Sequence, residues 1–257
     1  MTDSPEPRNA QTTQDARTLQ DARTVQLGER LDAVRQRISR AAAATGRGNN
    51  PPSLIVISKF HPVEDVRRLA ALGVRDFGEN RDQEASAKAE ELQALDLTWH
   101  FVGQLQSKKS KTVVRYASAV HSVDRSQLVT ALERAMAGQQ ELTGRGDLDC
   151  FIQVGLDDDA GAHRGGATPA EVPQLAEQLE AAGGLRLAGV MAVAPLGADP
   201  ERAFEKLLGI STGLQQDFPG ATGISAGMSQ DLEAAVRFGA THLRIGSDIL
   251  GSRPAVR

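Results

Sequence analysis

The sequence predicts a (β/α)8 barrel of the TIM type, and three observations lead to that prediction. Strand-like and helix-like segments alternate along most of the 257-residue chain, and eight of them are strand-like. The length allows one large domain with a substantial core. No glycine-rich phosphate fingerprint follows the first strand, which disfavours the alternative fold, a doubly wound open sheet.

The polar start of the chain differs in composition from everything that follows it. It repeats the motif QDART and contains few large apolar residues. A segment of this composition cannot bury enough apolar surface to order itself. The sequence therefore predicts a disordered tail over residues 1–24 and a globular domain over residues 25–257.

A helix is predicted ahead of the first strand. Leu27, Leu31, Val34 and Ile38 recur at the spacing of one helical face, and the pattern ends at Gly46. Because it precedes the alternating units, this helix is expected to be an extra element that covers the barrel.

The strands are predicted from short apolar runs. The first run is uninterrupted from Leu54 to Ile57, which is typical of a strand buried on both faces. The predicted strands are Leu54–Ser58, Val74–Phe77, Thr98–Val102, Ala119–Ser122, Asp149–Val154, Arg186–Met191, Gly223–Ser225 and Thr241–Ile245.

Helical segments separate these strands. They are predicted near 63–72, 80–94, 108–116, 125–138, 169–182, 200–216 and 230–238. Thr168 is expected to cap one of them, with Pro169 at its first position and Glu171 completing a capping box. Asp124 offers a similar cap to another.

Composition excludes several classes of protein. The formal charge of −4 and the isoelectric point near 5.8 argue against binding of nucleic acid. A single cysteine, Cys150, cannot form a disulfide within the chain, so a reducing cytoplasm is expected and Cys150 is interpreted as a small buried hydrophobe. No apolar run approaches the roughly 18 residues of a membrane span. No metal site is predicted.

The functional residues of such a barrel lie at the carboxyl ends of its strands, and the first strand ends at Lys59. A lysine at the end of a buried strand either reaches water or takes part in chemistry. Taken alone, the position of Lys59 favours a solvated strand end, and only its combination with other groups at the same place favours chemistry.

The seventh and eighth strands lead into turns that could bind phosphate. "GMSQDLEAAV" places Ser229 before a helix, and "IGSDILG" offers a second turn at Gly246 and Ser247. N–H groups at helix starts bind phosphate without a charged side chain, and TIM barrels often bind phosphate at this position. Ordinary helix capping is the alternative for either turn.

Arg244 is expected to point into the mouth of the barrel, because Leu243 and Ile245 alternate with it and are apolar. A buried ion pair, with Glu79 for example, is the alternative role for Arg244. A lysine close to cationic groups has a lowered pKa and can attack an aldehyde. An aldehyde that carries a phosphate is pyridoxal 5′-phosphate (PLP).

The sequence resembles the pyridoxal phosphate homeostasis protein family from about Leu27 to Arg253. The stretches that carry the resemblance are VISKFHP, FGENRDQEASAK, WHFVGQLQSKKSK, HSVDR, GLRLAGVMAV and GMSQDLEAAVRFGATHLRIGSDILGSR.

The resemblance implies a fold like the N-terminal barrel of alanine racemase and a PLP held as a Schiff base on Lys59. Its cofactor-binding residues would be Lys59, Asn80, Met228, Ser229, Arg244, Gly246 and Ser247. It also implies a monomeric cytoplasmic carrier or regulator of PLP, without established catalytic activity, whose partners would be PLP and PLP-dependent apoenzymes.

Some residues depart from the family pattern. Ser247 stands where the family often has threonine, and Arg164 stands where it commonly has lysine, so a second aldehyde-binding role at Arg164 is in doubt.

Two alternatives to a carrier stay open. One is an amino-acid racemase of the alanine racemase type, which needs a second acid–base group on the opposite ring face. The only tyrosine, Tyr116, falls on a predicted outer helix, and His100 is the best substitute although it is expected to be a packed barrel residue. The other is a barrel that binds a different phosphorylated metabolite, with Lys59 as a simple charge.

Overall fold

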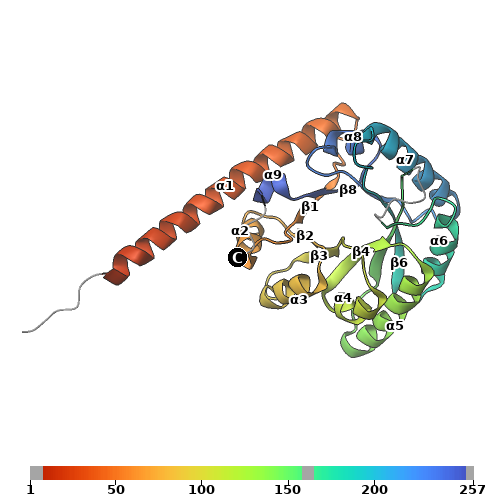
Figure 1. Cartoon of the computed structure of the whole chain (residues 1–257), viewed down its shortest axis with the longest axis horizontal. Helices are drawn as coiled ribbons and strands as arrows, with labels where there is room; N and C mark the ends of the chain where they lie inside the picture. The colour runs from red at the N-terminus through yellow and green to blue at the C-terminus, as the bar shows by residue number, and fades with distance from the viewer. Residues whose placement is uncertain (1–7, 158–164, 253–257) are drawn as a thin grey trace, which may run out of the picture.

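The strands predicted from the sequence close into a single parallel barrel in the order of the chain (Figure 1). The computed structural model describes residues 8–157 and 165–252. The strands are β1 Ser53–Ile57, β2 Asp76–Glu79, β3 Thr98–Phe101, β4 Ala117–Val123, β5 Leu148–Gln153, β6 Leu185–Met191, β7 Gly223–Ser225 and β8 His242–Ile245. β1 pairs with β8 from Ser53 opposite His242 to Val56 opposite Ile245, which closes the barrel.

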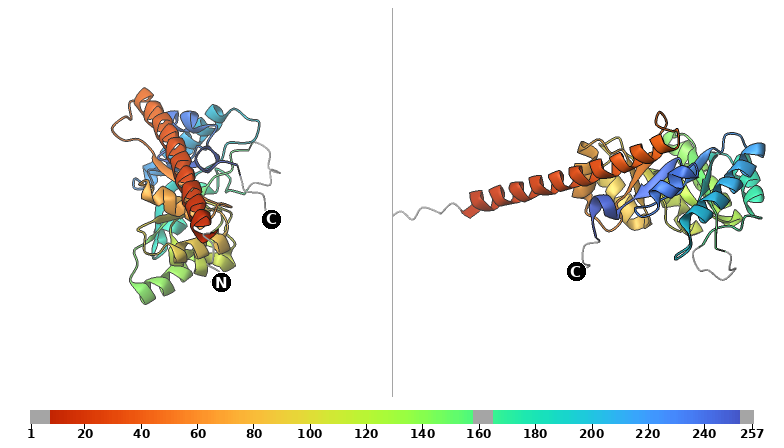
Figure 2. Two further views of the ribbon diagram at one scale, coloured as in Figure 1. Left: turned by 90° about the vertical axis from the view of Figure 1, so that its left-hand side faces the viewer. Right: turned by 90° about the horizontal axis from the view of Figure 1, so that it is seen from above.

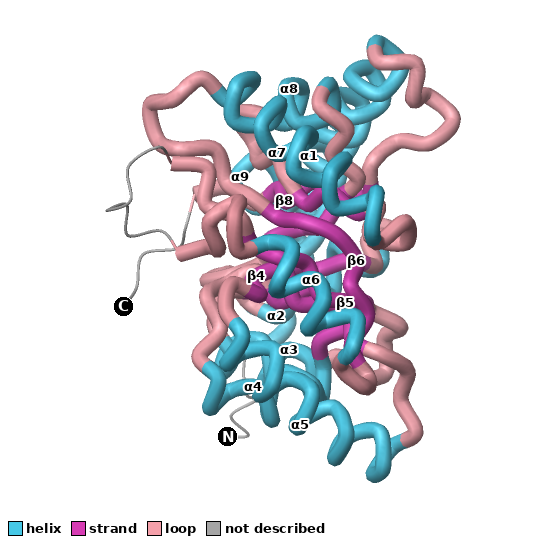
Figure 3. The backbone as a smooth tube through the Cα atoms, turned by 90° about the vertical axis from the view of Figure 1, so that its right-hand side faces the viewer, coloured by secondary structure: helices cyan, strands magenta, loops and turns pink. Residues whose placement is uncertain are grey.

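The helices surround the strands, as Figure 3 shows with helices in cyan and strands in magenta. They are α1 Arg8–Ala44, α2 Val63–Ala71, α3 Asp82–Glu91, η1 Ser107–Lys109, α4 Ser110–Tyr116, α5 Ser126–Thr143, α6 Val172–Ala181, α7 Pro200–Asp217, α8 Leu232–Arg237 and α9 Ser247–Leu250. The predicted (β/α)8 barrel is confirmed, with each predicted strand and helix present and most boundaries shifted by one to three residues.

The main apolar core lies between the strands and the helices. Leu243 and Ile245 belong to it and are fully buried, as the alternation along β8 predicts. A smaller cluster of Ala119, Phe151, Ala188 and Met191 lies apart from it. Cys150 is fully buried in the main core, which confirms its interpretation as a small hydrophobe.

Helix α1 covers the barrel beside α2, α8 and α9, and its N-terminal part projects beyond the barrel (Figure 2). Leu27, Leu31, Val34 and Ile38 are all buried, so the predicted covering helix is confirmed. The prediction of disorder up to residue 24 is wrong for residues 8–24, which form the first part of α1. Extending an existing helix costs far less than nucleating one, so a polar sequence can continue it.

The predicted helix caps are only partly present. The Glu171 carboxylate accepts hydrogen bonds from the Thr168 backbone N–H at 2.7 Å and its hydroxyl at 2.8 Å. However, α6 begins at Val172, so Thr168 and Pro169 lie in the preceding turn. Asp124 does not cap α5, because its carboxylate accepts from the guanidinium of Arg125. Within the described part of the chain, no helix has the length and apolar character needed to cross a membrane.

Candidate functional site

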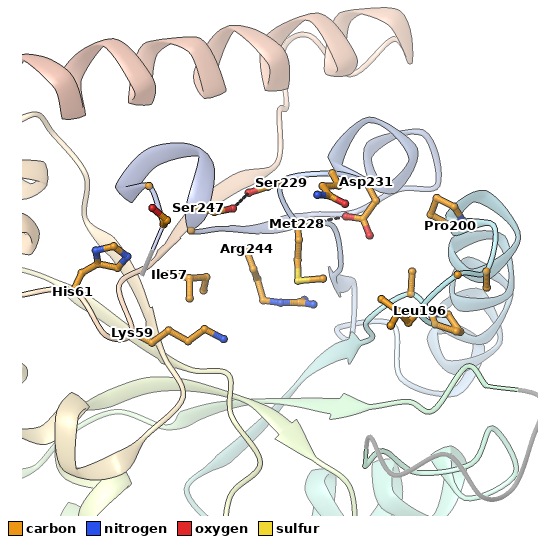
Figure 4. A pocket seen from close by; sticks show the side chains of 18 residues that line it. Ile57, Lys59, His61, Leu196, Pro200, Met228, Ser229, Asp231, Arg244 and Ser247 are labelled. Carbon is orange, nitrogen blue, oxygen red and sulfur yellow. Dashed lines mark hydrogen bonds between the residues drawn. The ribbon is translucent and has the colours of Figure 1, made fainter. Parts of the chain in front are cut away.

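One cavity of about 670 Å³ lies at the carboxyl ends of β1, β7 and β8 (Figure 4). Most of the residues predicted to bind a cofactor line it together, namely Lys59, Met228, Ser229, Arg244, Gly246 and Ser247. They come from the two ends of the chain, which meet because β1 pairs with β8. The barrel topology therefore assembles one site from segments far apart in sequence.

Lys59 belongs to a tight turn directly after β1. The backbone N–H of His61 donates to the carbonyl of Ser58 at 3.1 Å and closes this turn. The Lys59 side chain extends into the cavity on the side of Arg244 (Figure 4). Its amine thus shares the cavity with a second cationic group.

The two turns expected to bind phosphate lie next to each other. The Ser247 hydroxyl donates to the Ser229 hydroxyl at 3.2 Å, which joins the turn after β7 to the start of α9. Ser229 does not cap α8, whose N-cap residue is Asp231. The Asp231 carboxylate instead accepts from the Met228 N–H at 2.6 Å. The first N–H groups of a helix lack intrahelical partners and can bind an anion.

Close packing favours glycine at two points in these turns. Gly227 has φ +92°, and a Cβ there would lie 2.6 Å from the Cβ of Ala235. At Gly246 a Cβ would come 3.2 Å from the carbonyl oxygen of Ile57, so the start of α9 approaches the β1 backbone closely. Larger residues would push these turns out of the cavity wall.

Arg244 is buried, with 5% of its surface exposed. Its Nη1 donates to the hydroxyl of Ser225 at 2.7 Å and its Nη2 to the carbonyl of Ala192 at 2.9 Å. Burial lowers the pKa of the guanidinium to about 10, so Arg244 stays charged at neutral pH. Arg244 does not form the alternative ion pair with Glu79. The Glu79 carboxylate instead accepts a hydrogen bond from Lys88 at 2.7 Å.

A chain of hydrogen bonds continues inward from Arg244. Ser225 contacts His121 Nδ1 at 2.8 Å, His121 Nε2 contacts His100 Nδ1 at 3.0 Å, and His100 Nε2 contacts Asp76 at 3.0 Å. Arginine can only donate, so the Ser225 hydroxyl accepts a hydrogen bond from it and donates its own to His121 Nδ1. Burial holds the pKa of His121 well below its usual range, so this ring is neutral. This chain of hydrogen bonds fixes the orientation of Arg244 from the interior of the barrel.

Asn80 is the predicted residue that does not line this cavity. It follows β2 directly, and a Cβ at Gly103 would lie 2.3 Å from its carbonyl oxygen. Its side-chain Oδ1 is buried and has no hydrogen-bond partner in the described part of the chain. A buried amide oxygen without a partner is uncommon in folded proteins.

Several cavity residues are absent from the sequence prediction. His61, Asp231 and the loop 194–198 after β6 all line it. Burial lowers the pKa of His61. The position of His61, two residues after Lys59 at a strand end, is the signal that could have indicated it.

The groups considered as a second acid–base residue lie away from the cavity. Tyr116 is on α4, and its hydroxyl contacts Asp82 at 3.5 Å. His100 is held between Asp76 and His121 inside the barrel. Neither side chain lines the cavity. Arg164 lies outside the described residues.

Comparisons with a family model and with curated relatives point to the same family. Residues 30–254 match the family model for the alanine racemase N-terminal domain. The pyridoxal phosphate homeostasis protein of Corynebacterium glutamicum is 43% identical over 223 residues, which cover 86% of this chain and 99% of that protein. Its Escherichia coli counterpart is 34% identical over 233 residues, covering 88% and 97%.

Solved structures show the same fold. PipY of Synechococcus elongatus, solved with PLP bound, superposes with a TM-score of 0.74 at 34% identity, covering 88% of this chain and 100% of that one. Alanine racemase from Corynebacterium glutamicum gives a TM-score of 0.61 at 15% identity, covering 92% of this chain and 62% of the racemase. At that low identity the racemase likeness concerns the fold alone.

Proposed function

Because this chain belongs to the pyridoxal phosphate homeostasis protein family, we propose that it binds PLP in the cavity at the ends of β1, β7 and β8. The observation that carries the proposal is the meeting of a lysine, a buried arginine and two adjacent turns in one cavity. The lysine can react with an aldehyde, the arginine can donate to a ring nitrogen, and the two turns can bind a phosphate.

In this proposal, each part of the ligand has its own partner in the chain. Ser229, Gly246 and Ser247, with the Met228 backbone, hold the phosphate through N–H and hydroxyl groups. Arg244 faces the pyridine nitrogen and donates to it. Asn80 does not line the cavity, so its unpartnered side-chain oxygen is assigned no part of the ligand. The aldehyde supplies a carbonyl that condenses with the Lys59 amine, which forms a C=N bond and releases one water.

We propose a carrier or regulator of PLP rather than an enzyme. An arginine opposite the ring nitrogen leaves that nitrogen unprotonated, which weakens PLP as an electron sink. Racemisation also needs an acid–base group on each face of the ring, and neither Tyr116 nor His100 lines the cavity. A monomer in the cytoplasm that exchanges PLP with apoenzymes would need only reversible contacts of this kind.

The test is whether Lys59 forms a reducible bond with PLP. Wild-type protein incubated with PLP should absorb near the visible edge, and borohydride should fix the adduct on the peptide that contains Lys59. Lys59→Ala should lose the adduct and stay folded, because removing a cavity-facing amine opens no void in the core. Lys111→Ala, at an exposed position on α4, is the control.

Two outcomes would contradict the proposal. One is a wild-type protein with neither the absorbance nor the reduced adduct. The other is a lysine-linked adduct at full yield in Lys59→Ala, which would place the reactive amine elsewhere.

A further inference from the structure

The turn that presents Lys59 contains a strained backbone. Phe60 has φ +67°, and among the described residues it is the only non-glycine residue with positive φ. A bulky residue in the left-handed region is uncommon, and its backbone is strained there. It persists only when the surroundings hold it, so the contacts of Phe60 identify what does so.

Two side chains from the start of α3 hold Phe60. Its backbone N–H donates to Oε1 of Glu84 at 2.6 Å, a short bond to a charged acceptor. The guanidinium carbon of Arg81 lies 4.6 Å from the centre of the Phe60 ring. These contacts come from a different element of the barrel, so the conformation of Phe60 is imposed from outside the turn.

Lys88, one helical turn after Glu84, binds the backbone on the N-terminal side of Lys59. Its ammonium lies 2.7 Å from Oε1 of Glu84 and donates to the carbonyl oxygen of Ser58 at 2.8 Å. The same ammonium contacts Oε1 of Glu79 at 2.7 Å. The backbone on both sides of Lys59 is therefore bound to one ion cluster.

This cluster is costly and has no direct role in the cavity. Lys88 is 6% exposed and Glu79 is 1% exposed, and removing charges from water is expensive even when they are paired. Glu79, Glu84 and Lys88 do not line the cavity. Their bonds to the Ser58–His61 turn are the feature that links them to the site.

We propose that Glu84, supported by Lys88, is a positioning residue that holds the strained Phe60 turn so that the Lys59 amine stays aimed into the cavity. This inference rests on the proposed binding of PLP. Holding a reacting group in place removes much of the entropic barrier to bond formation. Loss of Glu84 should therefore weaken the bond between Lys59 and PLP while the phosphate turns keep their affinity.

The experiment compares two ligands across matched variants. PLP reacts with Lys59, whereas pyridoxine 5′-phosphate carries the same phosphate and ring but has no aldehyde. In Glu84→Ala, the fraction of Lys59 that carries PLP at equilibrium, measured by absorbance at subsaturating PLP before any reduction, should fall about tenfold. Binding of pyridoxine 5′-phosphate, measured by calorimetry, should change less than twofold. Glu84→Gln keeps a neutral acceptor and should lose less.

A matched control and a rescue sharpen the test. Glu91→Ala removes a carboxylate from the same helix, where it pairs with Arg67 on the surface, and should behave as wild type. Phe60→Gly removes the strain because glycine adopts positive φ freely. The effect of Glu84→Ala should therefore be several-fold smaller in the Phe60→Gly background, which a merely destabilising substitution would not produce.

The possible failures are distinguishable. If wild-type protein binds neither ligand, the proposed function is wrong. If wild type binds both and Glu84→Ala forms the Lys59 adduct normally, the positioning role is wrong. Equal losses for both ligands in Glu84→Ala and Glu84→Gln, with no relief from Phe60→Gly, would also overturn it.

Discussion

At the scale of single residues, Arg244 is a buried cation whose hydrogen-bond partners are neutral. Its guanidinium donates to a hydroxyl and a backbone carbonyl, and no described carboxylate lies within ion-pair distance of it. Burying a charge without an opposite charge costs free energy, and a ligand that accepts a hydrogen bond from the charged group can offset part of this cost. An electron-rich ring nitrogen in the cavity would give Arg244 a partner that the described chain does not supply.

The histidines beneath Arg244 make folding stability sensitive to acid. Burial lowers the pKa of His242 to about 4, with His100 and Arg244 lowering it further and Asp76 raising it. Between this value and about 6.5, the unfolded chain binds a proton that the folded chain does not. The free energy of unfolding should therefore fall as pH drops from 6.5 to 4, by up to about 3 kcal/mol from His242 alone.

His242→Gln tests this directly. Urea unfolding of wild type and variant should be compared at pH 7, 5.5 and 4.5. The loss of stability on acidification should be smaller in the variant, because glutamine does not titrate. A variant whose stability falls as steeply as that of wild type would show that other groups carry the acid sensitivity.

At the scale of elements, α1 joins the two turns that line the phosphate side of the cavity. Arg37 pairs with Glu233 of α8 at 2.9 Å and with Asp248 of α9 at 2.7 Å. It also donates to the carbonyl of Ser229 at 3.0 Å. One side chain therefore fixes the spacing between the turns, without lining the cavity itself.

Arg37→Ala should weaken the binding of PLP more than the binding of pyridoxal, which lacks the phosphate. We expect PLP affinity to fall about three- to tenfold, because the ion pairs are partly exposed but form a network. Pyridoxal affinity should stay unchanged. Absorbance titrations measure both, with Arg67→Ala as a surface control. Equal effects on the two ligands would show a general loss of structure rather than a role in spacing the turns.

Element positions followed from the sequence because apolar periodicity reports burial. The strand ends were therefore predictable, and with them the meeting of Lys59, Arg244 and Ser247. Helix starts were predicted less well, since the caps at Thr168 and Asp124 depend on side-chain contacts across turns. The ion cluster at Lys88 was not predictable, because a lysine on an amphipathic helix is normally solvated and only tertiary packing buries it.

At the scale of the whole molecule, the long helix α1 packs beside α2, α8 and α9 on the outside of the barrel (Figure 1). The described contacts between α1 and the barrel begin near Arg23, which pairs with Asp65 at 2.6 Å. We propose that residues 25–257 form the PLP-binding domain and that the residues up to Gln20, which precede this contact, are not needed for binding.

The final prediction separates a carrier from a racemase. A carrier should hold PLP through the phosphate and one reversible bond, and should return an α-proton to the face from which it was removed, if it removes one at all. D- and L-alanine are incubated with PLP-loaded protein in deuterated water, and α-hydrogen exchange is followed by NMR beside a genuine alanine racemase. Exchange with inversion should be negligible, because neither of the groups considered for the second ring face, Tyr116 and His100, lines the cavity. Racemisation that depends on Lys59 with a kcat on the order of 1 s⁻¹ or more lies in the ordinary enzyme range and would contradict the carrier function. In that case the first candidate for the second proton-transfer group would be His61, which lines the cavity two residues after Lys59, and His61→Ala should abolish the activity.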